Sequence, residues 1–173
     1  MPLSPAEEIL DVVDAADVVV GQATRAEIHR RGLRHRAVHI VVSNPRGEVF
    51  VQQRALSKDC QPGLWDTSAA GHVDHGESYD AAAERELAEE LGLVGEALEP
   101  WWSLVAGPLT GHEFVRVYRC CTMGEPRPDP LEIAASGWWT PAALSAWMTA
   151  RPQDFTAAFR AIFARYRAPE AAA

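Results

Sequence analysis

The sequence lacks the long apolar segment that a membrane-spanning helix needs. No stretch of its 173 residues approaches the ~18 consecutive apolar residues of such a helix. The N-terminal segment, MPLSPAEEIL, is acidic and lacks the hydrophobic centre of a signal peptide. We therefore expect no membrane segment and a cytoplasmic location.

A basic surface is also missing. Lysine and arginine together number 16, aspartate and glutamate 24, and the formal net charge is −8. Proteins that bind polymeric nucleic acid or anionic lipid through charge present an extended basic face. The composition therefore argues against both partners. An acidic protein can still bind a small phosphorylated molecule, provided that cations bridge the two.

Cysteine is scarce. The three cysteines, Cys60, Cys120 and Cys121, show no metal-site spacing and cannot all pair with one another. Two of them are adjacent, and neighbours in a strand point to opposite faces. A reduced, cytoplasmic setting fits this usage best.

The pattern of apolar residues predicts one domain with strands and helices mixed along the chain. Hydrophobic residues make up 47% and charged residues 23%, which is ordinary for a globular protein. We expect strands at 67–73, 101–107, 113–123 and 136–139, hairpins at 9–25 and 36–54, and helices at 26–32, 79–91, 141–149 and 153–166. Such a mixture implies a sheet covered by helices.

The helix over 79–91 concentrates negative charge. Ser78 is suited to cap its start and Gly92 to end it. Glu86, Glu89 and Glu90 project from one face, and like charges at this spacing cost roughly 0.2–0.5 kcal/mol per pair. Most acidic helix faces are simply solvated, but this one lacks the compensating lysines four residues away. A hard cation such as Mg²⁺ would relieve the repulsion, because it prefers several oxygen ligands.

A fixed pattern runs through this region: glycine, five residues, glutamate, seven residues, Arg-Glu-aliphatic, one residue, Glu-Glu, one residue and Gly-aliphatic. The positions are Gly71, Glu77, Arg85, Glu86, Leu87, Glu89, Glu90, Gly92 and Leu93. The pattern resembles the Nudix box without departure. The resemblance implies the Nudix fold, an α/β/α sandwich around a mixed β-sheet. We expect it as a single domain over residues 1–168, with N-terminal strands at about 9–23 and a disordered tail at 169–173.

The resemblance also implies a reaction. Nudix enzymes use Mg²⁺ or Mn²⁺ and an activated water to hydrolyse a diphosphate linked to another moiety. Carried over by position, the metal ligands are Glu86, Glu89, Glu90 and the backbone carbonyl of Ala70. Arg85 and Glu77 become supporting residues that orient the ligand carboxylates, beside Gly71. Each could instead belong to a plain surface ion pair.

Residues 35–72 bear a narrower resemblance, to type 1 isopentenyl-diphosphate isomerases and more closely to their hydrolase relatives within the Nudix superfamily. It implies that Arg54 and Lys58 grip the substrate diphosphate, with a solvated loop lysine as the alternative for Lys58. Arginine offers phosphate a planar fork and lysine a flexible point charge. His72, next to Gly71, is expected near the phosphates.

The isomerases also hold a metal with histidine and glutamate side chains around a catalytic cysteine. His35 and His72 match two of those histidines, Glu113 matches one glutamate, and His29 is offset by one residue. The second glutamate position holds Gly111 or His112, so the set is incomplete. Ala70 stands at the position of the cysteine, and its methyl group cannot transfer a proton. The resemblance therefore favours a hydrolase over an isomerase.

Several alternatives stay open. Glu113 is the candidate general base, with Glu89, Glu90 and Glu132 as alternatives. Nucleoside 5′-di- or triphosphates are the first choice of substrate, with nucleotide sugars and isoprenoid diphosphates behind. Trp101, Trp102, Trp138 and Trp139 could stack a base, although such pairs more often belong to the core. A non-catalytic nucleotide-binding module would be expected to lose box glutamates, and a homodimer is compatible with the sequence.

Overall fold

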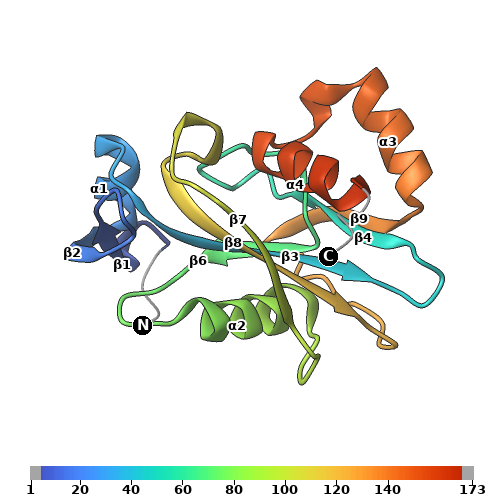
Figure 1. Ribbon diagram of the computed structural model, residues 1–173, viewed down its shortest axis with the longest axis horizontal. Helices are drawn as coiled ribbons and strands as arrows, with labels where there is room; N and C mark the ends of the chain where they lie inside the picture. The colour runs from blue at the N-terminus through green and yellow to red at the C-terminus, as the bar shows by residue number, and fades with distance from the viewer. Residues whose placement is uncertain (1–4, 169–173) are drawn as a thin grey trace.

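The computed structural model describes residues 5–168, and seven of its strands form one mixed sheet (Figure 1). These strands are β3 (His35–Ser43), β4 (Val49–Arg54), β5 (Trp65–Asp66), β6 (Ala69–His72), β7 (Glu99–Leu104), β8 (Glu113–Cys121) and β9 (Ile133–Trp139). The main path runs β5-β4-β3-β8-β7, with β6 paired to β3 and β9 paired to β4. The β3–β8 pair is parallel and the other pairs are antiparallel.

Helices cover both faces of this sheet. Helix α2 (Tyr79–Leu91) lies on one face, and α3 (Pro141–Ala150) and α4 (Ala157–Arg167) lie on the other (Figure 1). Alternate residues of β3 divide between the two layers: Val38 and Ile40 join the core beneath α2, whereas Ala37 and Val41 join the core beneath α4. This division follows from the two-residue period of a strand. The expected α/β/α sandwich around a mixed sheet is confirmed.

Two strands, β4 and β6, share one edge of β3. Strand β4 is in register with β3 only at its end, where Ser43 faces Val49. Strand β6 occupies the remaining length of that edge, with Ala37 opposite His72 and Ile40 opposite Ala69. The cavity lies beside β6, where the Ala70 amide donates a hydrogen bond to Glu90 of α2.

A small N-terminal unit closes one end of the cavity. It consists of the hairpin β1 (Ile9–Val13) and β2 (Val19–Thr24), followed by α1 (Arg25–Arg31). The Thr24 hydroxyl accepts a hydrogen bond from the amide of Glu27, and Gly32 ends the helix with φ of 62°. These two caps fix the short helix that carries His29.

Several elements differ from the sequence-based expectation. Strand β7 ends three residues before the end of the expected strand 101–107, and β9 begins three residues before the expected strand 136–139. The sequence predicts a loop over 57–66, but Trp65–Asp66 form β5 against β4. It predicts a last helix from 153, but that helix begins after Thr156, whose hydroxyl accepts from the amide of Phe159. The segment Pro152–Asp154 is instead a 3-10 turn, as are Pro5–Glu7 and Pro108–Thr110. The predicted tail at 169–173 lies outside the described residues. Within residues 5–168, no helix is both long and apolar enough to cross a membrane.

Candidate functional site

One large cavity, of about 1610 Å³, gathers the residues that the sequence singled out. It lies between α2, β6, the N-terminal unit and the loops after β4 and β8. Its lining includes Arg54, Lys58, Ala70, Gly71, His72, Arg85, Glu86, Glu89, Glu90 and Glu113. Glu77 lies behind this lining and contacts Arg85. The structure therefore brings together side chains that are far apart in the chain.

The carboxylates of α2 differ in burial. Glu86 and Glu90 are buried, with 8% and 4% of their surface exposed, whereas Glu89 reaches solvent. The Glu90 carboxylate accepts hydrogen bonds from the Gln52 side chain (2.7 Å) and from the Ala70 amide (3.2 Å). The N–H and C=O groups of one strand residue point to the same side of the strand. The Ala70 carbonyl therefore faces the same side as the Ala70 amide, toward Glu90 of α2. Carboxylate and carbonyl oxygens thus converge there.

Burial places two negative charges where neither is well solvated. It raises the pKa of Glu86, and the charge of Arg85 offsets this only in part. Burial, followed by the charge of Glu86, raises the pKa of Glu90 to about 7. Such a pair stabilises a bound cation, and its all-oxygen donor set suits Mg²⁺ or Mn²⁺. The residues present fit the cation that the family resemblance implies.

Gly71 leaves room for this arrangement. A Cβ atom at residue 71 would lie 2.1 Å from the Cδ atom of Glu86. Only glycine lets the carboxylate rest against the backbone of β6. The glycine of the box therefore acts here through close approach, and not through an unusual φ angle.

Arg85 holds the carboxylates in place from the outer side. Its Nε and Nη2 atoms donate to the two oxygens of Glu77 at 3.0 and 2.9 Å, and its Nη1 donates to Glu86 at 2.7 Å. Nη2 also donates to the carbonyl of His72 at 2.9 Å. The hydrogen bonds with Glu77 raise the pKa of Arg85, so the guanidinium stays charged. Both residues are arranged as the supporting pair that the sequence suggested.

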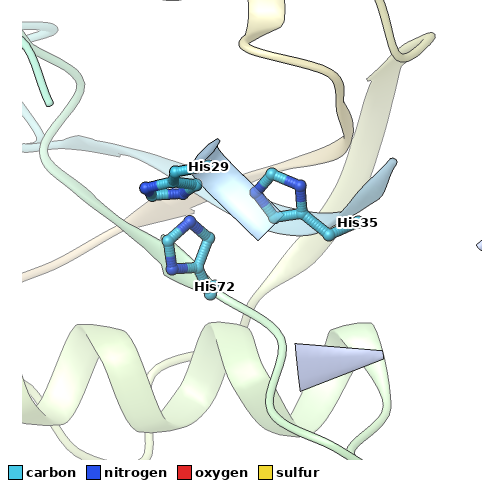
Figure 2. A group of neighbouring side chains, drawn as sticks. All are labelled: His29, His35 and His72. Carbon is cyan, nitrogen blue, oxygen red and sulfur yellow. The ribbon is translucent and has the colours of Figure 1, made fainter. Parts of the chain in front are cut away.

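Three histidines form a second cluster, in which His29 and His72 line the cavity and His35 is buried. His29 from α1, His35 from β3 and His72 from β6 face one another, with ring centroids 5.1–5.5 Å apart (Figure 2). One nitrogen of each lies within 4.8 Å of the others. The Glu113 carboxylate approaches Nε2 of His35 (3.4 Å) and Nε2 of His72 (3.3 Å). Gly111 and His112, at the remaining matched position, line the cavity without belonging to this group.

The hydrogen bonds around the histidines resemble those of metal ligands. Nδ1 of His35 lies 2.9 Å from the carbonyl of Leu33, and Nδ1 of His29 lies 3.3 Å from Asp59. Metal-binding histidines commonly donate one ring N–H to such an acceptor, which leaves the other nitrogen free. Nε2 of His35 is buried, and its contact is with the Glu113 carboxylate, 3.4 Å away. Three imidazoles and a carboxylate suit a borderline cation such as Zn²⁺.

Ionic contacts hold this cluster together without metal. Burial opposes the charged form of His72, but hydrogen bonds with Glu113 and Glu8 raise its pKa to about 9. Burial likewise opposes ionisation of Glu113, yet its contacts with His35 and His72 hold its pKa below the usual range. A carboxylate of low pKa is a weak proton acceptor. This environment is compatible with a ligand role for Glu113, and the general-base role considered from sequence stays a prediction.

We expect Glu113→Gln to weaken cation binding at the histidine cluster. Loss of a ligand charge should reduce Zn²⁺ affinity by at least about tenfold, measured by calorimetric titration of the purified protein. Glu125→Gln, at an exposed loop position, is the matched control. Unchanged affinity together with lost turnover would instead support Glu113 as the base.

The loop after β4 carries the two predicted diphosphate-binding residues. Arg54 donates from Nε and Nη2 to the carbonyl of Cys60 at 3.1 and 2.9 Å, and Lys58 forms an ion pair with Glu132. Burial lowers the pKa of Lys58. Lys58 is the only lysine of the chain. A phosphate reaching it would compete with Glu132.

Cys60 lies beside the histidine cluster. Its Sγ atom is 3.5 Å from Nδ1 of His29, and the residue lines the cavity. Burial raises the pKa of this thiol, which keeps it protonated. Cys120 and Cys121 lie on β8, as expected.

The tryptophans belong to the core. Trp101, Trp102 and Trp139 pack in the layer under α4, and Trp138 packs in the layer under α2. Among the described residues that line the cavity, none is a phenylalanine, tyrosine or tryptophan. The interpretation of these pairs as core is confirmed, and an aromatic platform for a base is missing from this lining.

Sequence reasoning missed four residues that shape the site. They are Glu8, Gln52, His39 and Asp66. One signal was available for His39: in RAVHI it follows His35 at an even spacing, which places both on the same face of the strand. The others depend on pairings between strands that are distant in sequence.

Comparison with known proteins agrees with this geometry. A model of the NUDIX domain matches residues 33–159, most of the chain. The chain belongs to the Nudix family. An isopentenyl-diphosphate Delta-isomerase of Serratia proteamaculans is 36% identical over 160 residues, covering 90% of this chain and 89% of that protein. An uncharacterized Nudix hydrolase of Streptomyces coelicolor is 44% identical over 117 residues, 60% of this chain and 65% of that one.

A solved structure shares the fold. The crystal structure of DR0079 from Deinococcus radiodurans aligns with a TM-score of 0.72 at 33% identity, covering 83% of this chain and 90% of that one. This Nudix protein is therefore similar both to proteins named as isomerases and to proteins named as hydrolases. The choice between these activities depends on the site itself.

Proposed function

We propose that this Nudix protein is a Mg²⁺- or Mn²⁺-dependent hydrolase that cleaves the diphosphate linkage of nucleoside 5′-di- or triphosphates. In the proposed reaction water attacks phosphorus. The observation that supports this proposal most strongly is the pair of buried carboxylates, Glu86 and Glu90, beside β6. All three ligand glutamates of the box are present, which argues against a non-catalytic binding module.

In this proposal the chain positions the cation and the phosphates. Glu86, Glu89, Glu90 and the Ala70 carbonyl would hold the cation. When bound, the cation neutralises phosphate charge and makes a coordinated water more acidic. The Glu77 carboxylate keeps Arg85 oriented, and Arg85 keeps the Glu86 carboxylate directed toward β6.

Other residues would bind the substrate. Arg54 presents a guanidinium anchored by the Cys60 carbonyl, and Lys58 exchanges its contact with Glu132 for a phosphate oxygen. Two positive side chains then face the anionic substrate across from the carboxylates. We propose a small-molecule ligand, without polymeric nucleic acid, and the homodimer remains a prediction.

Isomerase activity is the second candidate, because the histidine cluster with Glu113 resembles the isomerase metal site and relatives carry that name. Isomerisation requires one group to donate a proton to the carbon skeleton and another to remove one. Ala70 cannot do either. The Cys60 thiol lines the same cavity, but it lies beside His29, in the loop rather than on β6.

We expect phosphate release without isomerisation. The purified protein is incubated with Mg²⁺ or Mn²⁺ and a panel of nucleoside diphosphates, nucleoside triphosphates and isopentenyl diphosphate. Phosphate products and dimethylallyl diphosphate are then measured separately. Formation of the allylic product at an enzymatic rate would overturn the proposal, and Cys60→Ser would then test whether the thiol replaces the missing cysteine.

A further inference from the structure

His39 lies in the cavity and has no role in the hydrolysis described above. It is 5% exposed, lines the cavity, and stands directly opposite Ala70 in the β3–β6 pair. Directly opposed residues on a sheet have Cβ atoms about 4.5–5.5 Å apart. A moiety that extends over Ala70 from bound phosphates therefore passes next to His39.

The hydrogen bonds of His39 fix its tautomer. Nδ1 lies 2.8 Å from Oγ1 of Thr67, and that hydroxyl donates its own proton to the carbonyl of Ala69 at 3.3 Å. Thr67 therefore accepts from His39, and Nδ1 carries the ring proton. The Asp66 carboxylate, 3.6 Å from Nδ1, favours the same arrangement.

Hydrogen bonds connect the residues behind His39. The Asp66 carboxylate accepts from the amide of Thr67 at 2.8 Å and from the hydroxyl of Thr156 at 3.1 Å. These contacts tie β5, β6 and the start of α4 together around the imidazole. A side chain anchored in this way loses little freedom when it binds a ligand.

The other ring nitrogen is available. Nε2 of His39 has no hydrogen-bond partner within residues 5–168, and unlike Nε2 of His35 it is not sealed from solvent. Two neighbours on the same face, Ala37 and Ala70, are small and line the cavity. In the tautomer with the proton on Nδ1, Nε2 faces the cavity as the hydrogen-bond acceptor of the ring.

We propose that His39 determines substrate specificity by accepting a hydrogen bond from an O–H or N–H group of the moiety attached to the diphosphate. This inference rests on the proposed function for the position of the phosphates. The ribose of a nucleoside diphosphate offers such donors, whereas a prenyl chain offers none. The absence of aromatic side chains from the described lining agrees with recognition through hydrogen bonds in place of stacking.

A prenyl chain is the competing ligand. Leu109 and Leu131 line the cavity and are 69% and 77% exposed. They could cover an aliphatic moiety. The two ligand classes differ in their interaction with His39. A ribose can donate a hydrogen bond to Nε2, whereas a prenyl chain would leave this acceptor unpaired, which lowers the affinity.

Binding of non-hydrolysable ligands tests the inference independently of turnover. The α,β-methylene analogue of ADP and methylenediphosphonate are titrated calorimetrically into the wild-type protein, His39→Leu and His39→Gln with Mg²⁺. His39→Leu should weaken the nucleotide analogue about tenfold, as expected for one lost hydrogen bond, and leave methylenediphosphonate unchanged. His39→Gln keeps an acceptor and should restore most of the affinity.

Each other result overturns the inference. No effect on the analogue, an equal loss for both ligands, failure of the wild-type protein to bind the analogue, or no recovery in His39→Gln excludes His39 as the acceptor. The proposed hydrolysis is judged separately on ADP. If binding depends on His39 but ADP is not cleaved, the hydrolase proposal fails and the specificity role stands. If ADP is cleaved and His39→Leu binds the ADP analogue with wild-type affinity, the specificity role fails and the hydrolase proposal stands.

Discussion

Glu90→Gln should reduce metal-dependent phosphate release by roughly 10²–10³-fold, the range for loss of one strong electrostatic stabiliser. The amide keeps the shape of the side chain but removes the charge that the cation requires. Glu86→Gln should act similarly, since both carboxylates are buried beside β6. We expect Glu89→Gln to lose most activity as well, although its side chain is largely exposed.

The control for this series is Glu84→Gln, which makes the same chemical change at an exposed position on the same helix. Initial rates at saturating Mg²⁺ measure the effect. Wild-type turnover in all three box variants would reduce the helix to an ordinary acidic face. Equal loss in Glu84→Gln would point to unfolding, which circular dichroism detects.

The free energy of unfolding of the metal-free protein should depend on pH through Glu90. The folded-state pKa of Glu90, about 7, lies above its ordinary value of 4.5, so the folded protein binds this proton more tightly. Its contribution to stability is therefore present at low pH and is lost as pH rises toward and through 7. Glu90→Gln should flatten this part of the profile and be at least as stable as the wild type at pH 8 without metal.

Gly71→Ala should also lower metal-dependent phosphate release, although it removes no ligand. The new methyl group would meet the Glu86 carboxylate at 2.1 Å. The end of a glutamate side chain can move away, so the fold should persist while the carboxylate leaves its position. We expect Mg²⁺ affinity and phosphate release each to fall by at least about tenfold, as when the supporting contacts of a metal ligand are lost.

Gly21→Ala is the matched control, because its new Cβ would meet no atom within 4 Å. Titration with Mn²⁺, followed by electron paramagnetic resonance, reports cation affinity directly. A Gly71→Ala protein with wild-type cation affinity would mean that Glu86 does not bind the cation from its observed position.

Elements with strong local signals were predictable. The helix Tyr79–Leu91 has the expected bounds, because the Ser78 hydroxyl caps its first turn and Gly92 ends it with φ of 64°. The β3–β4 hairpin followed from its β-branched runs and the intervening turn. In each case the deciding interactions lie within a few residues of one another.

Elements that depend on distant partners were not predictable. The two-residue strand β5 exists because Gln52 and Gln53 of β4 face it in register. The last helix starts late because the amide of Thr156 donates to the carbonyl of Trp65 and its side chain caps the following turn. Neither contact leaves a local mark in the sequence.

The residues of the candidate site also fall into two groups, those predictable from a local motif and those positioned by distant contacts. The box residues were named from a contiguous motif, and the structure places Gly71, Arg85 and the three ligand glutamates of the box in the lining of one cavity. His29 is offset by one residue from the matched histidine position, so the sequence alone did not assign it to the cluster. In the structure, α1 positions it against His35 and His72. The position of Cys60 beside His29 was not predictable, because Cys60 lies in the loop after β4 and reaches His29 through the fold. Loop paths of this kind are set by tertiary contacts.

The central claim is metal-dependent attack of water on phosphorus, and isotope labelling tests it most directly. The protein is incubated with ADP in ¹⁸O-water with Mg²⁺, with EDTA, and as Glu90→Gln with Mg²⁺. We predict ¹⁸O in a phosphate-bearing product, phosphate or AMP, in the first reaction, and background labelling in the other two. Equal labelling with Mg²⁺ and with EDTA, or absence of label from both products while Mg²⁺ is saturating, would contradict the account.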